Sequence, residues 1–366
     1  MRGRGLAALC ALALLIAPAG VFGEEDAGGR LTPGEGKCGK PGCYWETPMD
    51  IRDEAAVWAM LTAPITVVDG EQTEQAVLYA EPSEDAEAVA DVTCYSQGVH
   101  VLDTLSDGWS LVECYSSSFH DSKIKAWNQL SRGYIKTGRL TVREVKNTYG
   151  MVVDKMTQRL YVFKEGALYD VLKVSTGLIN DEQPFNETRS GEFILCSRTG
   201  AFASGNLTCG LAIRFNAGDL LHEVPHKQRE GGKKDYSFCE PQLGQRASHG
   251  CIRVQRLRTS KGLNMQWIWD TMKKELGTRI VIWEDWKGRE LPYPDDQSQV
   301  YYNPNKGKNY HAAETCYSVK DEFLPLAAFS YWELDLESYA GLTPCDYCNP
   351  PLRHAEIDEI NRLYAQ

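Results

Sequence analysis

The sequence lacks a basic stripe. Its 39 Lys and Arg residues are outnumbered by 50 Asp and Glu residues, which gives a formal net charge of −11. Proteins that bind nucleic acid gather Lys and Arg on one face, so we expect no nucleic-acid partner. An acidic chain is also not attracted to anionic polymers by charge alone.

Long apolar runs are missing after the first residues. Because a membrane-spanning helix needs about 20 consecutive apolar residues, we expect no membrane span once the N-terminus is cleaved. The apolar run of residues 6–17 follows two arginines and is followed by small residues before Glu24. This order predicts a secretory signal peptide over residues 1–23, with an uncleaved anchor as the alternative. Cys10 has no lipobox around it, which argues against a lipid anchor.

The rest of the composition is ordinary for a folded protein, with 43% hydrophobic and 24% charged residues. A chain of 366 residues is long enough for two or three domains. Twelve cysteines are present, and eleven (12 − 1) remain when Cys10 leaves with the signal peptide. An odd number predicts a free thiol in a secreted protein, where disulfides can persist.

The most informative stretch is Ser-His-Gly-Cys-Ile-Arg at residues 248–253. Gly250 allows a tight turn, which exposes the thiol of Cys251 and lets backbone N–H groups converge on a developing oxyanion. His249 and Arg253 are expected to favour the thiolate, which is the reactive form of cysteine. We therefore predict that Cys251 is a nucleophile. The alternative, a buried structural cysteine, does not account for the flanking Ser-His-Gly.

A nucleophilic cysteine also needs a base, which is usually distant in the sequence. His222 is the best candidate because it follows the apolar pair Leu220-Leu221 and is expected at the end of a strand. His226 is the rival, but it follows Pro225 in a polar stretch. We therefore predict that His222 takes the proton of the thiol.

These motifs resemble the signature of the YkuD-type L,D-transpeptidases. The resemblance extends from about Tyr149 to Asp285 and includes segments similar to the opening hairpin of the family and its next two strands. These segments are residues 150–154, 159–163, 173–177 and 188–193. The resemblance implies a mostly β catalytic domain over residues 147–286.

The same resemblance implies a secreted cell-wall enzyme whose partners are peptidoglycan stem peptides, as donor and acceptor. Cys251 would attack an L,D-peptide bond of a tetrapeptide stem with His222 as its base, forming a thioester without a catalytic cofactor. An amine from a neighbouring stem would resolve the thioester into a crosslink, whereas water would make the enzyme an L,D-carboxypeptidase. Arg253 could also contact a substrate carboxylate. Four residues are expected to support the turn and the oxyanion: Ser248, His249, Gly250 and Arg253.

This sequence departs from the family pattern at two points. The gap between His222 and Ser248 is 26 positions (248 − 222), longer than usual, because residues 223–247 contain an insertion. Glu223 stands where the family has a small residue that helps to orient the histidine. These departures keep a second hypothesis open, a non-catalytic cell-wall-binding protein.

Two further segments precede the catalytic region. Residues 24–72 combine a leader rich in Gly, Glu and Pro with a short helix predicted over residues 53–61. Residues 73–142 alternate short strands with turns such as Asp107-Gly108. This order resembles bacterial SH3-like domains, which are small barrels that often bind cell-wall peptides in secreted proteins. A structural spacer is the alternative.

Residues 299–366 contain a second candidate site. A Cys-x2-Cys knuckle, with a His and a third Cys nearby, offers the ligands that tetrahedral zinc takes. The surroundings resemble small zinc-binding modules with a Tyr-His…Cys…Pro-Cys-x-x-Cys pattern, so we predict a structural zinc in a small α+β module. The predicted ligands are His311, Cys316, Cys345 and Cys348.

Disulfides are the rival interpretation of the cysteines. If zinc takes three, seven remain besides the nucleophile, and three local pairs would leave Cys239 over. Those pairs are Cys38 with Cys43, Cys94 with Cys114, and Cys196 with Cys209. If all ten pair, no zinc site of this kind survives. The sequence as a whole predicts a multidomain, mainly β protein with an SH3-like barrel, a catalytic domain and a zinc module.

Overall fold

The computed structural model describes residues 29–30, 49–284, 289–316 and 318–365. Strands dominate this part of the chain, which contains three α-helices, so the mainly β fold predicted from the sequence is confirmed. No helix within the described ranges is long and apolar enough to cross a membrane. The predicted signal peptide, most of the leader and the pair of Cys38 and Cys43 lie outside the described residues.

Six strands form the N-terminal sheet. They are β1 (Gly29–Arg30), β3 (Gln75–Tyr79), β4 (Ala88–Thr93), β5 (His100–Thr104), β6 (Trp109–Tyr115) and β7 (Leu130–Lys136). Their order is β4-β3-β7-β6-β5, with β1 paired to β7. The predicted turn at Asp107-Gly108 joins β5 to β6, and Gly108 adopts φ 87°, a conformation that glycine tolerates. That this sheet is an SH3-like domain with the predicted limits stays a prediction.

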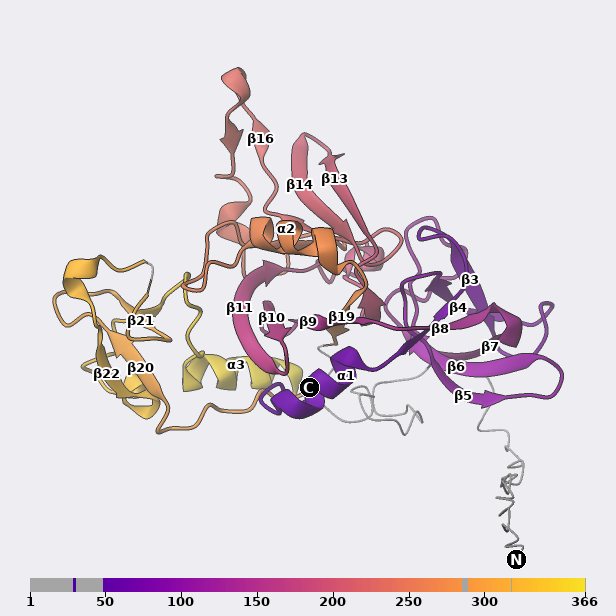
Figure 1. Ribbon diagram of the computed structural model, residues 1–366, viewed down its shortest axis with the longest axis horizontal. Coiled ribbons are helices and arrows are strands. Elements are labelled where there is room, and N and C mark those ends of the chain that lie inside the picture. The colour runs from indigo at the N-terminus through magenta and orange to yellow at the C-terminus, as the bar shows by residue number, and fades with distance from the viewer. Residues whose placement is uncertain (1–28, 31–48, 285–288, 317, 366) are drawn as a thin grey trace, which may run out of the picture.

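Nine strands form the central sheet, which lies between the N-terminal sheet and the C-terminal part of the chain (Figure 1). They are β9 (Lys146–Asp154), β10 (Arg159–Lys164), β11 (Ala167–Ser175), β12 (Gly191–Ile194), β13 (Ser197–Ser204), β14 (Leu207–Arg214), β15 (Leu220–Glu223), β18 (Ile252–Val254) and β19 (Thr278–Trp283). Their order is β12-β19-β9-β10-β11-β18-β15-β14-β13. A short antiparallel pair joins β2 (Ile65–Val68), which precedes β3, to β8 (Leu140–Arg143), which follows β7 and leads into β9.

Two helices cover opposite faces of the central sheet. Successive side chains of a strand point to opposite faces, and in β9 Met151 and Val153 pack with α2 (Met265–Glu275) whereas Val152 packs with α1 (Glu54–Thr62). Figure 1 shows the helices on either side of the strands. Burial on both faces explains the apolar runs at residues 151–153 of β9 and 280–283 of β19. The helix predicted over residues 53–61 is α1, whose N-cap is Asp53.

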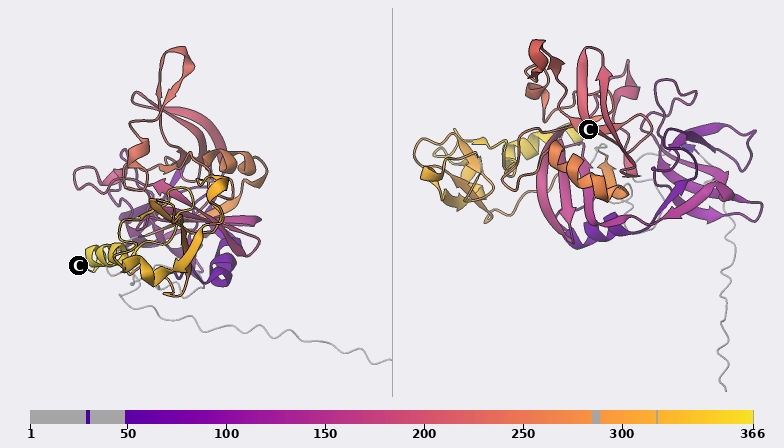
Figure 2. Two further views of the ribbon diagram at one scale, coloured as in Figure 1. Left: turned by 90° about the vertical axis from the view of Figure 1, so that its left-hand side faces the viewer. Right: turned by 45° about the horizontal axis from the view of Figure 1, so that its top comes forward.

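The insertion connects two parallel strands. β15 and β18 pair in parallel, so the chain between them has to cross from one end of the sheet to the other. Within this connection β16 (Lys227–Gln228) and β17 (Lys234–Asp235) form a small antiparallel hairpin. Figure 2 shows this hairpin projecting from the body of the molecule.

The C-terminal part is a small α+β unit. Its sheet contains β20 (Gln299–Tyr302), β21 (Asn309–His311), β22 (Ala327–Ser330) and β23 (Thr343–Pro344), in the order β22-β20-β21-β23. The chain ends in α3 (His354–Tyr364). The unit contacts the central sheet through Lys173, which forms an ion pair with Asp346, and through Asn349, whose Nδ2 donates to the Val171 carbonyl over 3.0 Å.

The described cysteines are free, including two of the pairs considered from the sequence. Cys209 lies opposite Phe202 in the β13–β14 hairpin, whereas Cys196 donates its N–H to the Arg214 carbonyl at the other end of that hairpin. A disulfide needs Cα atoms within about 7 Å, so the hairpin holds these two cysteines too far apart. Cys94 and Cys114 are both buried in the N-terminal core as free thiols.

Candidate active site

The predicted nucleophile lies in the turn that leads into β18. Gly250 adopts φ 116°, and a Cβ at this position would come within 2.5 Å of Asp219 Oδ1 and 2.7 Å of Arg189 Nη1. Both the backbone conformation and the lack of space therefore require glycine. The tight turn predicted around Gly250 is present, and it places Cys251 immediately before the strand.

Four hydrogen bonds made by Ser248 and Thr188 hold the turn in place. The Ser248 hydroxyl donates to the Cys251 carbonyl and accepts the Gly250 N–H over 3.3 Å. Thr188 Oγ1 donates to the Gly250 carbonyl over 2.7 Å and accepts the N–H of Gly177 over 2.8 Å. The buried side chain of Ser248 therefore stabilises the turn through hydrogen bonds to the backbone of the turn.

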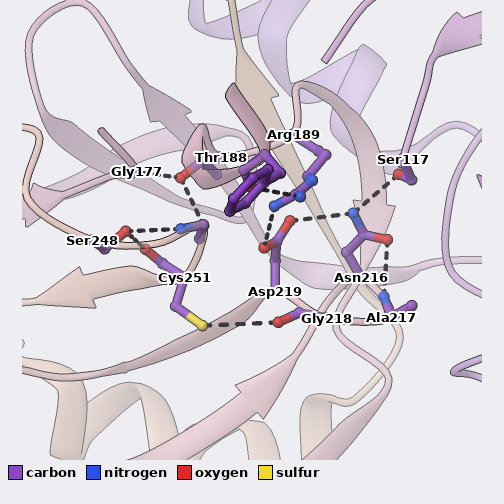
Figure 3. A network of polar contacts seen from close by, with 12 residues as sticks. Ser117, Gly177, Thr188, Arg189, Asn216, Ala217, Gly218, Asp219, Ser248 and Cys251 are labelled. Carbon is purple, nitrogen blue, oxygen red and sulfur yellow. Dashed lines mark hydrogen bonds and ion pairs between the residues drawn. The ribbon is translucent and has the colours of Figure 1, made fainter. Parts of the chain in front are cut away.

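The thiol of Cys251 is partly exposed and protonated at rest. Its sulfur faces the Gly218 carbonyl at 3.9 Å (Figure 3). Burial, followed by the negative charge of Asp219, raises the pKa of Cys251 to about 12, against the smaller opposing effect of the Leu220 N–H. The sequence led us to expect that His249 and Arg253 favour the thiolate. Arg253 and Cys251 interact in the expected direction, but burial and Asp219 outweigh this interaction in the resting site. His249 is exposed.

His222 lies on β15, where the parallel register places it beside Arg253. Cys251 precedes Arg253 by two residues, so the histidine and the cysteine belong to the same face of the sheet. Nδ1 of His222 is 2.6 Å from the Glu223 carbonyl. Because a carbonyl only accepts, Nδ1 carries the proton and Nε2 is left as the basic nitrogen. Burial lowers the pKa of His222 to about 4, so the ring is neutral near pH 7.

Glu223 has two separate functions in the site. Its carbonyl fixes the tautomer of His222, which is the orienting role that the sequence left open. Its side chain is buried and accepts from Lys234 Nζ over 2.9 Å and from the Tyr236 hydroxyl over 3.3 Å. Glu223 therefore anchors the inserted hairpin to the strand that carries the histidine. A Cβ on Gly210 would lie 2.5 Å from Oε1 of Glu223, which explains the glycine there.

His226, the rival base, belongs to a different cluster. Its Nδ1 is 3.8 Å from Oε1 of Glu223, and its ring packs on Tyr236 with centroids 5.2 Å apart. Its backbone pairs with Thr208 of β14. His226 therefore faces the hairpin of the insertion, beside the side chain of Glu223.

Arg253 lies between the nucleophile and the insertion. It is buried, and its Nη1 donates to Oε1 of Gln242 over 2.8 Å. Burial lowers the pKa of Arg253, while the thiols of Cys239, Cys209 and Cys251 favour its charge, in that order. The buried guanidinium thus faces three thiols, of which only Cys251 is partly exposed.

Sequence reasoning missed the ion pair behind the turn. Arg189 Nη1 is 3.0 Å from Oδ1 of Asp219, and both side chains are buried (Figure 3). Asp219 also raises the pKa of Cys251. The sequence contains no local signal for this pair, because its members are 30 positions apart and neither belongs to a chemical motif.

The four predicted zinc ligands come together in the C-terminal unit. One ligand atom each from His311, Cys316, Cys345 and Cys348 lies within 4.8 Å of all the others. Sγ of Cys316 is 3.8 Å from Sγ of Cys345, and Sγ of Cys348 is 3.6 Å from Nδ1 of His311. A disulfide has an S–S length of about 2.05 Å, so these thiols are unbonded. Three sulfurs and one imidazole nitrogen form the donor set of a closed structural zinc site.

Comparison with known families supports the assignment of the central region. Residues 148–282 match the YkuD family model, described as the L,D-transpeptidase catalytic domain. This range contains β10–β18, α2 and the Cys251 turn. The predicted resemblance is therefore confirmed for these residues, which match the L,D-transpeptidase catalytic domain.

Solved structures give weaker matches. An L,D-transpeptidase from Xylanimonas cellulosilytica is 20% identical over 38% of this chain and 64% of its own, with a TM-score of 0.27. A fused Zn-dependent amidase/peptidase/peptidoglycan-binding domain-containing protein from Clostridium acetobutylicum is 21% identical over 38% and 55%, with a TM-score of 0.26. An L,D-transpeptidase from Mycobacterium smegmatis is 16% identical over 61% and 92%, with a TM-score of 0.30.

This chain thus spans less than two thirds of the first two of these structures. At these TM-scores the matches carry no argument about its architecture or activity. No curated protein matches the chain.

Proposed function

We propose that this protein is a secreted peptidoglycan L,D-transpeptidase that acts through a cysteine thioester. The observation that carries the proposal is the thiol of Cys251 in a glycine turn, on the same sheet face as a buried neutral His222, within a YkuD domain. Secretion rests on the sequence of residues 1–23, and the stem-peptide substrate rests on the family.

The acylation step uses the two side chains in turn. As Sγ of Cys251 attacks the carbonyl carbon of the L,D-peptide bond, Nε2 of His222 takes the thiol proton. The negative charge on the carbonyl oxygen is stabilised by backbone N–H groups of the turn at Gly250 and Cys251. When the C–N bond breaks, the imidazolium returns its proton to the amine of the departing D-residue, and a thioester remains.

The second step releases the enzyme. An amine from a neighbouring stem attacks the thioester carbonyl, and His222 takes the proton that this amine loses. The C–S bond breaks, the imidazolium protonates the sulfur, and the product is a peptide crosslink. Water as the acceptor gives the L,D-carboxypeptidase alternative by the same sequence of proton transfers. The insertion at residues 223–247 borders the site through Gln242 and is the segment that we expect to choose the acceptor.

The resting protonation states define the order of events. With the pKa of Cys251 raised to about 12 and that of His222 lowered to about 4, a thiolate–imidazolium pair is disfavoured before substrate binds. Proton transfer therefore accompanies the attack instead of preceding it. We expect the free enzyme to react slowly with simple alkylating agents at neutral pH.

We further propose that the C-terminal unit binds a structural zinc ion through His311, Cys316, Cys345 and Cys348. With four protein ligands the site has no open position for a substrate, so the metal would stabilise the fold of the unit and take no part in the acyl transfer. The ligands come from β21, from the loop after it and from the Cys-x2-Cys knuckle after β23, so one ion would join three segments.

Intact mass spectrometry tests the acyl-enzyme. The family resemblance implies that carbapenems acylate the catalytic cysteine, so the mature protein incubated with a carbapenem should gain the mass of one adduct. The Cys251→Ala variant should remain folded and gain none, whereas Cys239→Ala, which removes a different buried thiol, should still be acylated. Folded, reduced wild-type protein that forms no adduct with either a carbapenem or a tetrapeptide would favour a wall-binding protein without catalysis.

A further inference from the structure

The wall behind the nucleophile is made of a buried charge pair. Arg189 and Asp219 are both nearly inaccessible and lie 3.0 Å apart. Because Gly250 has no side chain, Arg189 and Asp219 can lie directly against its backbone. A Cβ added to Gly250 would collide with both residues. The ion pair is therefore in direct van der Waals contact with the turn that carries Cys251 (Figure 3).

Asp219 belongs to the loop that surrounds the sulfur. The preceding residue, Gly218, presents its carbonyl to Sγ of Cys251, and the following residue, Leu220, presents its N–H. Asn216 Nδ2 donates to Oδ2 of Asp219 over 3.4 Å. One short loop thus contacts the nucleophile and carries the carboxylate behind it, so any movement of Asp219 moves the sulfur's neighbours.

The N-terminal part of the chain holds this loop from the other side. Nε and Nη2 of Arg189 donate to the Ser118 carbonyl over 3.2 and 3.1 Å. The guanidinium stacks on the Phe119 ring at 4.1 Å, and a Cβ on Gly218 would lie 2.6 Å from that ring. Asn216 Nδ2 donates to the Ser117 hydroxyl over 3.0 Å. The segment after β6 therefore contacts Arg189 directly, and it reaches the loop of Asp219 through Asn216 and Gly218.

We propose that Arg189 and Asp219 are positioning residues that fix the Cys251 turn against the N-terminal part of the chain, and that the buried Asp219 carboxylate behind the turn sets the electrostatic environment of the thiol. The N-terminal part then completes the active site, beyond any role as a wall-binding domain or a spacer. The effect on acyl transfer rests on the proposed function, whereas the effect on the thiol does not.

Charged and titratable groups approach Cys251 from several segments. Asp219 and Arg189 lie behind the turn, Cys209 faces it from β14, His222 lies on the same sheet face on β15, and Arg253 faces it from β18. Burial is the largest cause that raises the pKa of the Cys251 thiol, and the charge of Asp219 is the second largest. The charge of Arg189 lowers this pKa weakly. Removing the charge of Asp219 should therefore lower the pKa of Cys251, a result that loss of packing alone does not predict.

The test measures alkylation of Cys251 by iodoacetamide in the full chain between pH 6 and 10, by peptide mass spectrometry. In Asp219→Asn we expect the rate at pH 8 to rise at least about threefold, which corresponds to a shift of half a pH unit. An alkylation profile identical to that of the wild type, in protein shown to be folded by circular dichroism, would overturn the proposal.

Glu113→Gln is the matched control. Glu113 Oε2 is 2.9 Å from Arg132 Nη2 in another buried ion pair, which lies within the N-terminal sheet. Breaking either pair leaves a buried charge uncompensated, so both variants should unfold at lower denaturant concentration. Only Asp219→Asn should change the alkylation profile of Cys251. An equal change in Glu113→Gln would mean that general loosening is the cause, and the proposal would be wrong.

Arg189→Lys keeps the test decisive if Asp219→Asn does not fold. Lysine retains the positive charge beside Asp219 but cannot make both contacts with the Ser118 carbonyl. We expect carbapenem acylation to slow at least about tenfold, while the rate of alkylation at pH 8 stays within about twofold of the wild type. A wild-type acylation rate would overturn the positioning role. If the wild type itself is not acylated but the alkylation shift is observed, the proposed function fails and the effect on the thiol stands.

Discussion

His222 and Arg253 lie side by side in the only parallel contact of β15, the pairing with β18. This register places the histidine two residues from the position level with Cys251, on the same face. A shift of one residue would turn His222 to the opposite face and remove the base from the site. The pairing of these two short strands therefore decides whether the chain has a catalytic pair.

The identity of the base gives the first prediction. We expect His222→Ala to slow acylation of Cys251 by about 10² to 10⁴-fold, the usual contribution of a general base. His226→Ala should stay within about threefold of the wild type because His226 faces the insertion beside Glu223. Stopped-flow or mass-spectrometric acylation rates distinguish the two. Full activity in His222→Ala, with loss in His226→Ala, would reverse the assignment.

The buried imidazole predicts a loss of stability in acid. The unfolded ring has a pKa of 6.5, whereas burial lowers the folded value to about 4. Between these values the unfolded state binds the proton, so the free energy of unfolding falls as the pH decreases from 6.5 towards 4. The group contributes up to about 3 kcal/mol over this range. Urea unfolding at pH 7 and pH 4.5 should show a smaller decrease in His222→Gln than in the wild type.

The control for this measurement is His249→Gln. His249 is an exposed neighbour of the nucleophile, and its loss should leave the difference between pH 7 and pH 4.5 as in the wild type. If His222→Gln and His249→Gln lose the same stability in acid as the wild type, His222 is not the group that burial keeps neutral.

The crowded surroundings of Gly250 predict that one added methyl group lowers both stability and activity. In Gly250→Ala the new Cβ meets Asp219 and Arg189 at φ 116°, so we expect destabilisation by about 3 kcal/mol or more and loss of acylation. Gly200→Ala is the matched control, since Gly200 has φ 96° with nothing within 4 Å of its added Cβ. It should cost only about 1 kcal/mol of backbone strain and should keep the acylation rate. Equal destabilisation of both variants would show that the space behind Gly250 is not constrained.

The cluster of one histidine and three cysteines in the C-terminal unit predicts how many zinc ions each chain binds. Mature protein, purified without chelator, should contain about one zinc per chain by elemental mass spectrometry, because four ligands make one closed site. Cys345→Ser should lose the zinc and lower the unfolding midpoint of the C-terminal unit, while Cys196→Ser should retain the metal. Peptide mapping that finds disulfides among Cys316, Cys345 and Cys348, without zinc, would establish the rival interpretation.

Local features of the fold followed from the sequence. The helix predicted over residues 53–61 is α1, which begins one residue later. Its start is set by Asp53, whose side chain accepts the N–H of Ala56. Gly250 and Cys251 were predictable for the same reason, because a nucleophile turn is a local motif. The four ligands around His311 were also recognised from their spacing, although 29 residues separate Cys316 from Cys345.

The rest depended on contacts that spacing does not encode. The protonation state of the Cys251 thiol is set by burial and by the charge of Asp219. Asp219 is 32 positions from Cys251, so the sequence does not identify the two as neighbours. The free Cys196 and Cys209 were misjudged because their separation in the sequence fits a hairpin, while the register of that hairpin holds them apart. Long-range packing, rather than local propensity, decided each of these points.

The position of the Cys-x2-Cys knuckle at residues 345–348 has a consequence for solubility. β18 pairs with β11 only at Val174 and Ser175, which leaves the earlier part of that side of β11 without a partner strand. Asn349 donates to the Val171 carbonyl there, and the side chain of Gln255 accepts the Lys173 N–H over 2.6 Å. Unpaired strand edges recruit other chains. The C-terminal unit thus acts as a cover for an open β-edge, and a chain truncated before it would be prone to aggregate along β11.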